Sequence, residues 1–182
     1  MLLKELCKIG GLRWIRILYC YPEEIYEELI DSMIRNTKVC HYLDLPIQHC
    51  NDTILKRMAR KTNKADIERI VTHLRERIPD ITLRTTLITG FPGETEEDFL
   101  ETMDVVQKVR FDSAFTFIYS PREGTPAAKM EDPIDDATKH RRLEELISHI
   151  NKDALKRNEE YVGKVVKVLV EGVSKRNDNI LS

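Results

Sequence analysis

The chain has 182 residues, of which 33% are charged and 41% hydrophobic, with a formal net charge of −2. This length suffices for one core of ordinary size, and no apolar run approaches the ~18 residues of a transmembrane helix. Seven glycines and seven prolines without a low-complexity tract exclude collagen-like and disordered chains. No charged-then-apolar leader opens the sequence, so we expect a globular, cytoplasmic chain.

The chain contains four cysteines at wide spacing, at positions 7, 20, 40 and 50. Zinc ribbons and iron–sulfur sites need at least one close pair of cysteines, and no CxxC or CxxxC motif occurs. A small secreted disulfide scaffold would be richer in cysteine. We therefore expect four reduced, mostly buried thiols and no metal ligand among them.

Strand and helix patterns alternate from the start of the chain. Residues 12–19 alternate roughly between charged and apolar side chains, which predicts a strand. Pro22 suits the first turn of a helix whose buried stripe contains Ile25, Leu29, Ile30 and Met33. Residues 39–47 then form a mostly apolar run of strand length, which Pro46 closes.

Two helices are predicted before the next strand. Residues 53–59 indicate a short helix, and Asn63 with Asp66 resembles a capping box for a second one. The buried face of that second helix contains Ile67, Ile70, Val71, Leu74 and Ile78. The strand predicted at residues 81–89 runs directly into the segment Gly90–Thr95.

The second half continues the alternation and then changes character. Thr95 and Asp98 form a capping box for a helix, and residues 113–119 are an apolar and aromatic strand. A long helix opens after Pro133, with an apolar stripe of Leu143, Leu146, Ile147, Ile150, Ala154 and Leu155. After Gly163 the period becomes two, which predicts a strand with one face made of Val166, Val168 and Val170. We expect residues 174–179 to be a hairpin turn whose return strand is missing.

Strands that alternate with helices of this length indicate βα units on a parallel sheet, hence an α/β fold. Four such units make half of a (β/α)8 barrel or the core of a doubly wound sheet, and both bind ligands at the carboxyl ends of the strands. Gln48 and His49 follow the second predicted strand. Arg84 lies within the third, and Tyr119 and Ser120 come at the end of the fourth.

The segment Gly90–Thr95 lacks the lysine and the spacing of a P-loop, and it does not match GxGxxG. Its glycines would let backbone approach a ligand closely, and the following helix offers free N–H donors. The acidic residues 96–98 oppose an anion there and favour a hydroxyl- or ammonium-bearing ligand. A tight, well-capped strand-to-helix turn is an equally good interpretation.

Three further features have two interpretations each. His49 fits an acid, a base or a metal ligand, although a hydrogen-bonded histidine at a strand end is more common. Arg84 needs a partner when buried, either a ligand carboxylate or a neighbouring acid. A basic cluster could contact a polyanion or form a solvated helix face, and it consists of Lys56, Arg57, Arg60, Lys61 and Lys64.

These segments resemble the radical S-adenosylmethionine (SAM) methylthiotransferases over essentially the whole chain, most specifically at residues 42–49, 54–58, 90–99 and 119–128. The resemblance implies that residues 1–162 are the C-terminal part of a radical-SAM partial (β/α) barrel. It also implies that residues 163–182 begin a TRAM domain, a small β-barrel. The N-terminal domain and the cysteine motif of the cluster would lie upstream of this chain.

The resemblance further implies the cofactors SAM and [4Fe–4S] clusters, whose ligands are not in this chain. Contacts to SAM are expected from Gln48, Arg84, Gly90, Gly93, Glu94, Tyr119 and Ser120. Catalysis by this family inserts a methylthio group into an unactivated C–H bond through a 5′-deoxyadenosyl radical.

Two substrates of the family compete. Residues 14–60 resemble the enzymes that modify an aspartate of ribosomal protein S12, which we slightly favour. Residues 111–117 and 170–175 resemble the enzymes that modify an isopentenylated adenosine beside the anticodon of tRNA. The partner is then the ribosome or tRNA, with no membrane involved. A third interpretation is a truncated, non-catalytic fragment, and we expect no turnover from the chain alone.

Overall fold

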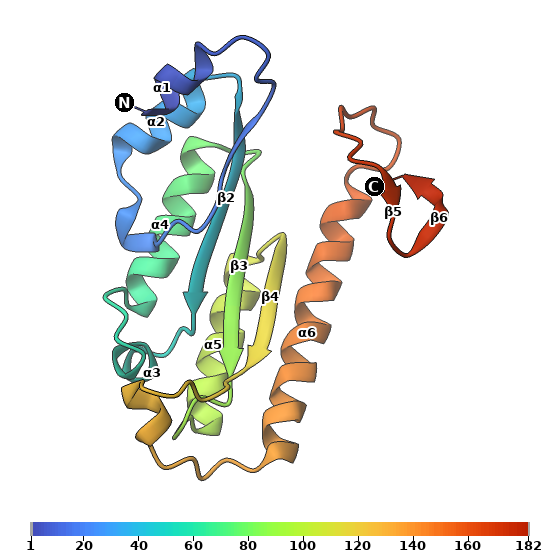
Figure 1. Ribbon diagram of the computed structural model, residues 1–182. Helices are drawn as coiled ribbons and strands as arrows, with labels where there is room; N and C mark the ends of the chain where they lie inside the picture. Colours follow the sequence, from blue (N-terminus) through green and yellow to red (C-terminus); the bar gives the residue numbers. More distant parts are fainter. Residues whose placement is uncertain (1, 182) are drawn as a thin grey trace.

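Four parallel strands form one sheet in the computed structural model, which describes residues 2–181 (Figure 1). The strands are β1 (Ile15–Ile17), β2 (Val39–Gln48), β3 (Thr82–Thr89) and β4 (Ser113–Ile118). Each strand pairs in parallel with the next, so their order in the sheet is the order in the chain. A doubly wound sheet reverses its strand order at a switch point, whereas a barrel does not. The α/β prediction is confirmed, and the order is that of a partial barrel.

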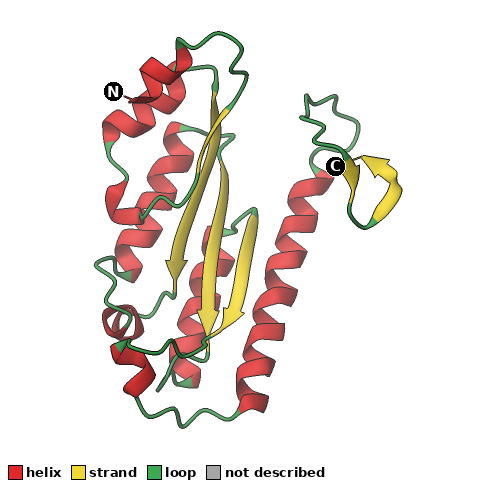
Figure 2. Ribbon diagram, in the orientation of Figure 1, coloured by secondary structure: helices red, strands yellow, loops and turns green. Residues whose placement is uncertain are grey.

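Helices cover one face of this sheet (Figure 2). They are α2 (Glu27–Arg35), α3 (Asp52–Arg57), α4 (Lys64–Arg77), α5 (Glu96–Val109) and α6 (Asp136–Glu159). In Figure 1, α4 and α5 lie behind the sheet and α6 runs along β4, which it contacts. Burial alternates along β3 and β4, with Leu83 and Leu87 fully buried and Phe115 and Phe117 about half exposed. The core therefore lies between the helices and one sheet face, and the other face is uncovered.

Side-chain caps fix the points at which helices begin beside the carboxyl ends of the strands. Asn51 accepts hydrogen bonds from two backbone N–H groups at the start of α3. Thr95 and Asp98 form the predicted capping box of α5. At α4, Asn63 accepts from the Asp66 N–H, which is one half of the predicted box. Each cap satisfies donors that a helix leaves free, and so sets where the preceding loop must end.

The N-terminal segment differs from the prediction in three ways. A helix that the sequence did not signal, α1 (Leu2–Cys7), precedes β1. The strand predicted over residues 12–19 is paired only at Ile15–Ile17, and the left-handed φ of 55° at Tyr19 ends the extended backbone on its C-terminal side. Pro22 opens a short 3₁₀ turn, Pro22–Glu24, and α2 begins only at Glu27.

The strand predicted across Val166–Val170 is wrong. These residues are irregular and exposed, and the strands of this region are β5 (Val173–Ser174) and β6 (Asn177–Leu181). They pair antiparallel, so the return strand of the hairpin lies within the chain. Alternation alone forms no strand when neither a partner strand nor a core receives its apolar face. The assignment of residues 163–182 to a separate β domain stays a prediction.

A last short helical turn, Pro126–Lys129, leads into α6. None of the helices in the described part of the chain combines the length and the apolar character needed to cross a membrane.

Candidate functional site

A cleft of about 680 Å³ lies at the carboxyl ends of the strands. It is lined by residues that end or follow β2, β3 and β4 and by the turn at Pro126. Its volume lies in the usual range for small-molecule sites. Three of the predicted site residues line it, namely Gln48, Tyr119 and Ser120. The turn Gly90–Glu94 contributes Phe91 to the lining, and the Phe91 and Tyr119 rings meet edge-on at 5.0 Å.

The backbone at Gln48 turns sharply as β2 ends. Gln48 has a φ of 71°, and the N–H of His49 donates to the carbonyl oxygen of Ile47 at 2.9 Å. This is a three-residue turn with a left-handed centre, which costs about 1–2 kcal/mol for a residue other than glycine. Such backbone persists only where the surroundings hold it, and it concentrates at functional sites.

Gly90 and Gly93 also need left-handed backbone, with φ values of 68° and 75°. A Cβ at Gly90 would lie 2.7 Å from Lys139 Cγ, and one at Gly93 would lie 2.6 Å from Arg57 Nη1. Both positions therefore require glycine for conformation, and Gly90 also for space, whereas the neighbour of Gly93 is the end of a flexible side chain. Neither lines the cleft, and both shape the turn that carries Phe91 into it.

Glu94 is buried beneath this turn and joins three parts of the chain. Its carboxylate accepts a hydrogen bond from the Gly90 N–H at 2.7 Å and one from Arg142 Nη1 at 2.7 Å. His49 Nε2 lies 2.9 Å from its other oxygen. Because the Asn51 N–H donates to His49 Nδ1 at 3.0 Å, Nε2 carries the proton and donates to Glu94. The hydrogen-bonded interpretation of His49 is therefore the one that the structure shows.

Arg84 lies outside the cleft lining, on the uncovered face of the sheet, and its partner is a neighbouring acid. Arg84 Nη2 donates to Asp44 Oδ2 at 2.6 Å, and this hydrogen bond raises the pKa of the guanidinium above its ordinary value. Asp44 is only 1% exposed, and its Oδ1 and the Nε of Arg84 have no partner among the described residues. The guanidinium also lies 4.6 Å from the Phe115 ring centroid.

The charge at the cleft is positive. Arg57, Arg60 and Arg122 line it, no acidic side chain does, and none of the three forms an ion pair within residues 2–181. The Arg60 guanidinium is held by the Pro46 carbonyl at 2.6 Å and by the Tyr21 ring. Residues 96–98 do not line this cleft, and Glu96 is paired with Arg141 and Arg142. The expectation that these acids oppose an anion at the start of α5 stays a prediction.

Two residues that the sequence did not single out are Phe91, which lines the cleft, and Arg142, which binds Glu94 beneath the turn. Phe91 lies within the Gly90–Thr95 segment, but a phenylalanine in a sequence fits the core as well as the wall of a cleft. Arg142 lies on the same stripe of α6 as Leu146 and Ile150 and is 4% exposed. The predicted stripe was displaced, since Leu155 is 60% exposed. The signal that could have found Arg142 is its i, i+4 and i, i+8 spacing with buried apolar residues.

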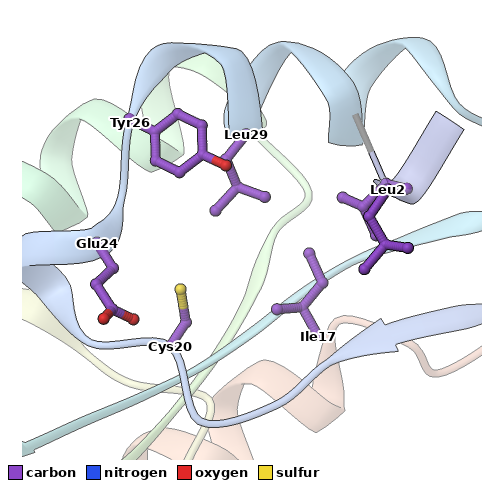
Figure 3. A pocket seen from close by; sticks show the side chains of 7 residues that line it. Leu2, Ile17, Cys20, Glu24, Tyr26 and Leu29 are labelled. Carbon is purple, nitrogen blue, oxygen red and sulfur yellow. The ribbon is translucent and has the colours of Figure 1, made fainter.

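A second hollow of about 550 Å³ lies between α1, β1 and α2 (Figure 3). The side chains of Leu2, Ile17, Cys20 and Leu29 face it, and burial raises the pKa of the Cys20 thiol to about 11. This thiol is therefore protonated near neutral pH, and the hollow is mostly apolar.

The cysteines are all free, with Cys20 and Cys50 buried and the other two partly exposed. Burial also raises the pKa of the Cys50 thiol. Across the described residues, no group of three or more histidine, cysteine, aspartate or glutamate side chains is placed to hold a metal ion. The residues present therefore do not fit an iron–sulfur cluster.

Comparison with known proteins places this geometry in a family. The profile of the radical SAM superfamily matches residues 1–106. The ribosomal protein uS12 methylthiotransferase RimO of Lachnoclostridium phytofermentans is 54% identical over 171 residues, which are 94% of this chain and 39% of that protein. The tRNA-2-methylthio-N(6)-dimethylallyladenosine synthase of a Thermoanaerobacter species is 51% identical over 181 residues, which are 100% of this chain and 38% of that protein.

Among solved structures, coproporphyrinogen III oxidase (HemN) from Escherichia coli, a radical SAM enzyme, has a similar fold. The TM-score is 0.64 at 24% identity, over 77% of this chain and 32% of that one. The chain spans about two fifths of the length of the curated relatives it matches. The resemblance seen in the sequence is confirmed: the chain belongs to the radical SAM superfamily, and its similar curated relatives are methylthiotransferases.

Proposed function

We propose that this chain is the cofactor-binding part of a cytoplasmic radical SAM methylthiotransferase, an enzyme that inserts a methylthio group into an unactivated C–H bond. The observation that supports it best is the cleft at the strand ends, which gathers Gln48, Tyr119 and Ser120 in a radical SAM fold. Curated relatives about half identical to the chain carry methylthiotransferase names.

The cleft suits SAM in size and in chemistry. The Tyr119 side chain lines the cleft, and its buried phenolic oxygen has no partner among the described residues. The paired rings of Phe91 and Tyr119 offer an apolar wall for a planar base, and the Gln48 amide and the Ser120 hydroxyl can bond ring nitrogens or ribose oxygens. SAM held in this cleft would supply the radical chemistry of this superfamily.

In this proposal the residues of the chain bind and orient, and the cluster ligands come from outside it. The three arginines at the cleft neutralise an anionic group of a bound ligand, a role that guanidinium groups perform well because they donate in a planar fork. Arg84 and Asp44 pair on the uncovered sheet face, where Asp44 Oδ1 and Arg84 Nε are buried without a partner among the described residues.

The favoured substrate is the aspartate of ribosomal protein S12. The uS12 methylthiotransferase is the more identical of the two relatives described above, at 54% against 51%. The alternative substrate is N6-isopentenyladenosine beside the anticodon of tRNA. The match to the tRNA enzyme supports this alternative, because it covers 100% of the present chain and so includes the C-terminal segment.

Mass spectrometry of cells that lack this gene distinguishes the substrates. We expect the S12 aspartate to lose its methylthio group while the tRNA nucleoside is unchanged. Loss of the tRNA modification alone would replace the favoured substrate by the alternative. If both modifications persist, the proposed function is overturned.

The 182-residue chain should show no turnover by itself. After iron–sulfur reconstitution, we expect no methylthio product from either substrate, because the described residues hold no cluster ligand set. Product above the level of a protein-free control would contradict this expectation. In that case the chain would not depend on ligands from elsewhere.

A further inference from the structure

We infer that Arg142 is a positioning residue that controls the shape of the cofactor cleft from helix α6, acting through Glu94 and His49. The inference rests on the proposed function, because it assigns these residues a role toward the SAM site. Neither the sequence pattern nor the similarity to relatives assigns Arg142 a role.

The three side chains form a hydrogen-bonded chain inside the protein, from Arg142 through Glu94 to His49. The side chains of Arg142, Glu94 and His49 are 5%, 0% and 0% exposed. Arg142 Nη1 donates both to the Glu94 carboxylate at 2.7 Å and to the Glu94 carbonyl oxygen at 3.1 Å. It therefore holds the side chain and the backbone of the same residue, which fixes the end of the turn.

The carboxylate of Glu94 reaches the ends of two strands at once. Its bond to the Gly90 N–H holds the turn after β3, and the next residue, Phe91, lines the cleft. Its bond to His49 holds the segment after β2, and the preceding residue, Gln48, lines the cleft as well. The buried Glu94 carboxylate thus connects the two segments that bring Phe91 and Gln48 to the cleft.

The backbone conformation at the ends of β2 and β3 makes these hydrogen bonds of Glu94 important for the shape of the cleft. Gln48 and Gly90 each adopt left-handed φ, at 71° and 68°, and this conformation at Gln48 is unfavourable without support. Buried ion pairs contribute little net stability, yet removal of one partner leaves an uncompensated charge. Such a network is therefore better suited to hold one geometry than to stabilise the fold.

The test compares Arg142→Gln and Arg142→Lys with Arg141→Gln in the 182-residue chain. Arg141 is the matched control, because it neighbours Arg142 on α6 but is half exposed and pairs with Glu96 and Glu145 at the surface. Two quantities are measured: the Kd for S-adenosylhomocysteine by calorimetry, and the hydrogen-exchange rate of the Gly90 amide by NMR. The thermal midpoint of each variant reports on the fold.

We expect Arg142→Gln to weaken S-adenosylhomocysteine binding at least about tenfold and to speed Gly90 exchange by a similar factor, since a charge-assisted bond is lost. Arg142→Lys should recover part of both losses. Arg141→Gln should leave both within about twofold of the unmodified chain, as expected for an exposed pair. A folded Arg142→Gln chain with unchanged affinity and unchanged Gly90 exchange would overturn the inference.

If Arg142→Gln does not fold, the pair Arg142→Gln with Glu94→Gln removes both charges and avoids an unpaired buried carboxylate. This double variant should fold and still show faster exchange of the Gly90 amide. Unchanged exchange in the double variant would also overturn the inference. Failure of the proposed function gives a different result. In that case the unmodified chain does not bind S-adenosylhomocysteine, while the exchange measurement still tests the network.

Discussion

Left-handed backbone concentrates where the strands meet the candidate site. Gln48, Gly90 and Gly93 all adopt positive φ within a few residues of the ends of β2 and β3. Side chains from other elements lie close to the two glycines, with Lys139 beside Gly90 and Arg57 beside Gly93. The loops at this end are therefore shaped by close contacts.

The Gly90→Ala substitution should destabilise the chain by about 1–3 kcal/mol, because a left-handed alanine is strained. The new Cβ would also meet Lys139, whose Nζ is bound to Asp132 at 2.6 Å and so cannot move freely. Urea denaturation measures the change. Gly10→Ala is the control, since its Cβ meets nothing within 4 Å and its φ is not positive; an equal loss in both variants would contradict this account.

Individual site residues could be predicted from the sequence where local chemistry demanded a partner. Arg84, charged within an apolar strand, required either a ligand carboxylate or a neighbouring acid, and it has Asp44. Glu94 was expected to contact the cofactor, and we now propose that it acts by holding the turn, since its carboxylate already accepts three hydrogen bonds from the protein. The spacing of Arg142 with Leu146 and Ile150 marks it as a residue on the buried stripe of α6, but its partner Glu94 depends on how α6 packs beside the turn, which no local pattern encodes.

Helix α5 joins the site to the core along its length. Its capping box at Thr95 begins directly after the Gly90–Glu94 turn, and Phe99 follows one turn later, fully buried. Movement of α5 would therefore move the turn. Its outer face is exposed, as Leu100 shows at 51%.

Replacement of Phe99 by alanine should lower the free energy of unfolding by about 3–5 kcal/mol, because a fully buried ring leaves a cavity. The neighbouring Leu100→Ala should change it by less than about 0.5 kcal/mol, as is usual for exposed positions. Chemical denaturation of both variants tests the pair. Equal losses would show that α5 packs on the sheet with a different face.

Acidification should weaken the ion pairs that join Glu96 on α5 to Arg141 and Arg142 on α6. The pKa of Glu96 is held below its ordinary value, first by the hydrogen bond from Arg141 and also by that from Arg142. A carboxylate with a lowered folded-state pKa stabilises the fold above its unfolded pKa of about 4.3, and this stability is lost as pH falls through the folded pKa.

Glu96→Gln should therefore lose less stability than the unmodified chain between about pH 5 and pH 3. Thermal midpoints across that interval measure the slope. Glu97→Gln, at an exposed neighbouring position, should keep the slope of the unmodified chain. A Glu96→Gln slope equal to that of the unmodified chain would show that this carboxylate does not contribute.

At the scale of elements, the predicted βα alternation is confirmed, because buried strands and amphipathic helices carry strong periodic signals. The predictions fail towards both ends of the chain. Helix α1 has only six residues and none is buried, although Leu3 and Cys7 pack partly buried against the core, and so short a segment carries no clear periodic signal. The valines of residues 166–170 alternate without any surface to receive them.

The whole molecule divides into the sheet with its helices and a C-terminal hairpin beyond the end of α6 (Figure 1). Strands β5 and β6 contact mainly each other, and the side chains of residues 164–172 are exposed. Truncation after residue 160 should therefore change the free energy of unfolding by less than about 0.5 kcal/mol. Denaturation of the shortened chain tests this, and a large loss would show that the hairpin packs on the sheet in solution.

Any reaction at the uncovered face of the sheet would take place in contact with solvent. A species able to remove hydrogen from an unactivated carbon attacks whatever lies beside it, and enzymes prevent such side reactions by excluding solvent. Here Phe115 and Phe117 stand about half exposed on that face. Water, buffer and dissolved oxygen could all reach the space in front of the Arg84–Asp44 pair. Enclosure of this face, by further protein or by the substrate itself, is thus a condition for radical chemistry to reach its target.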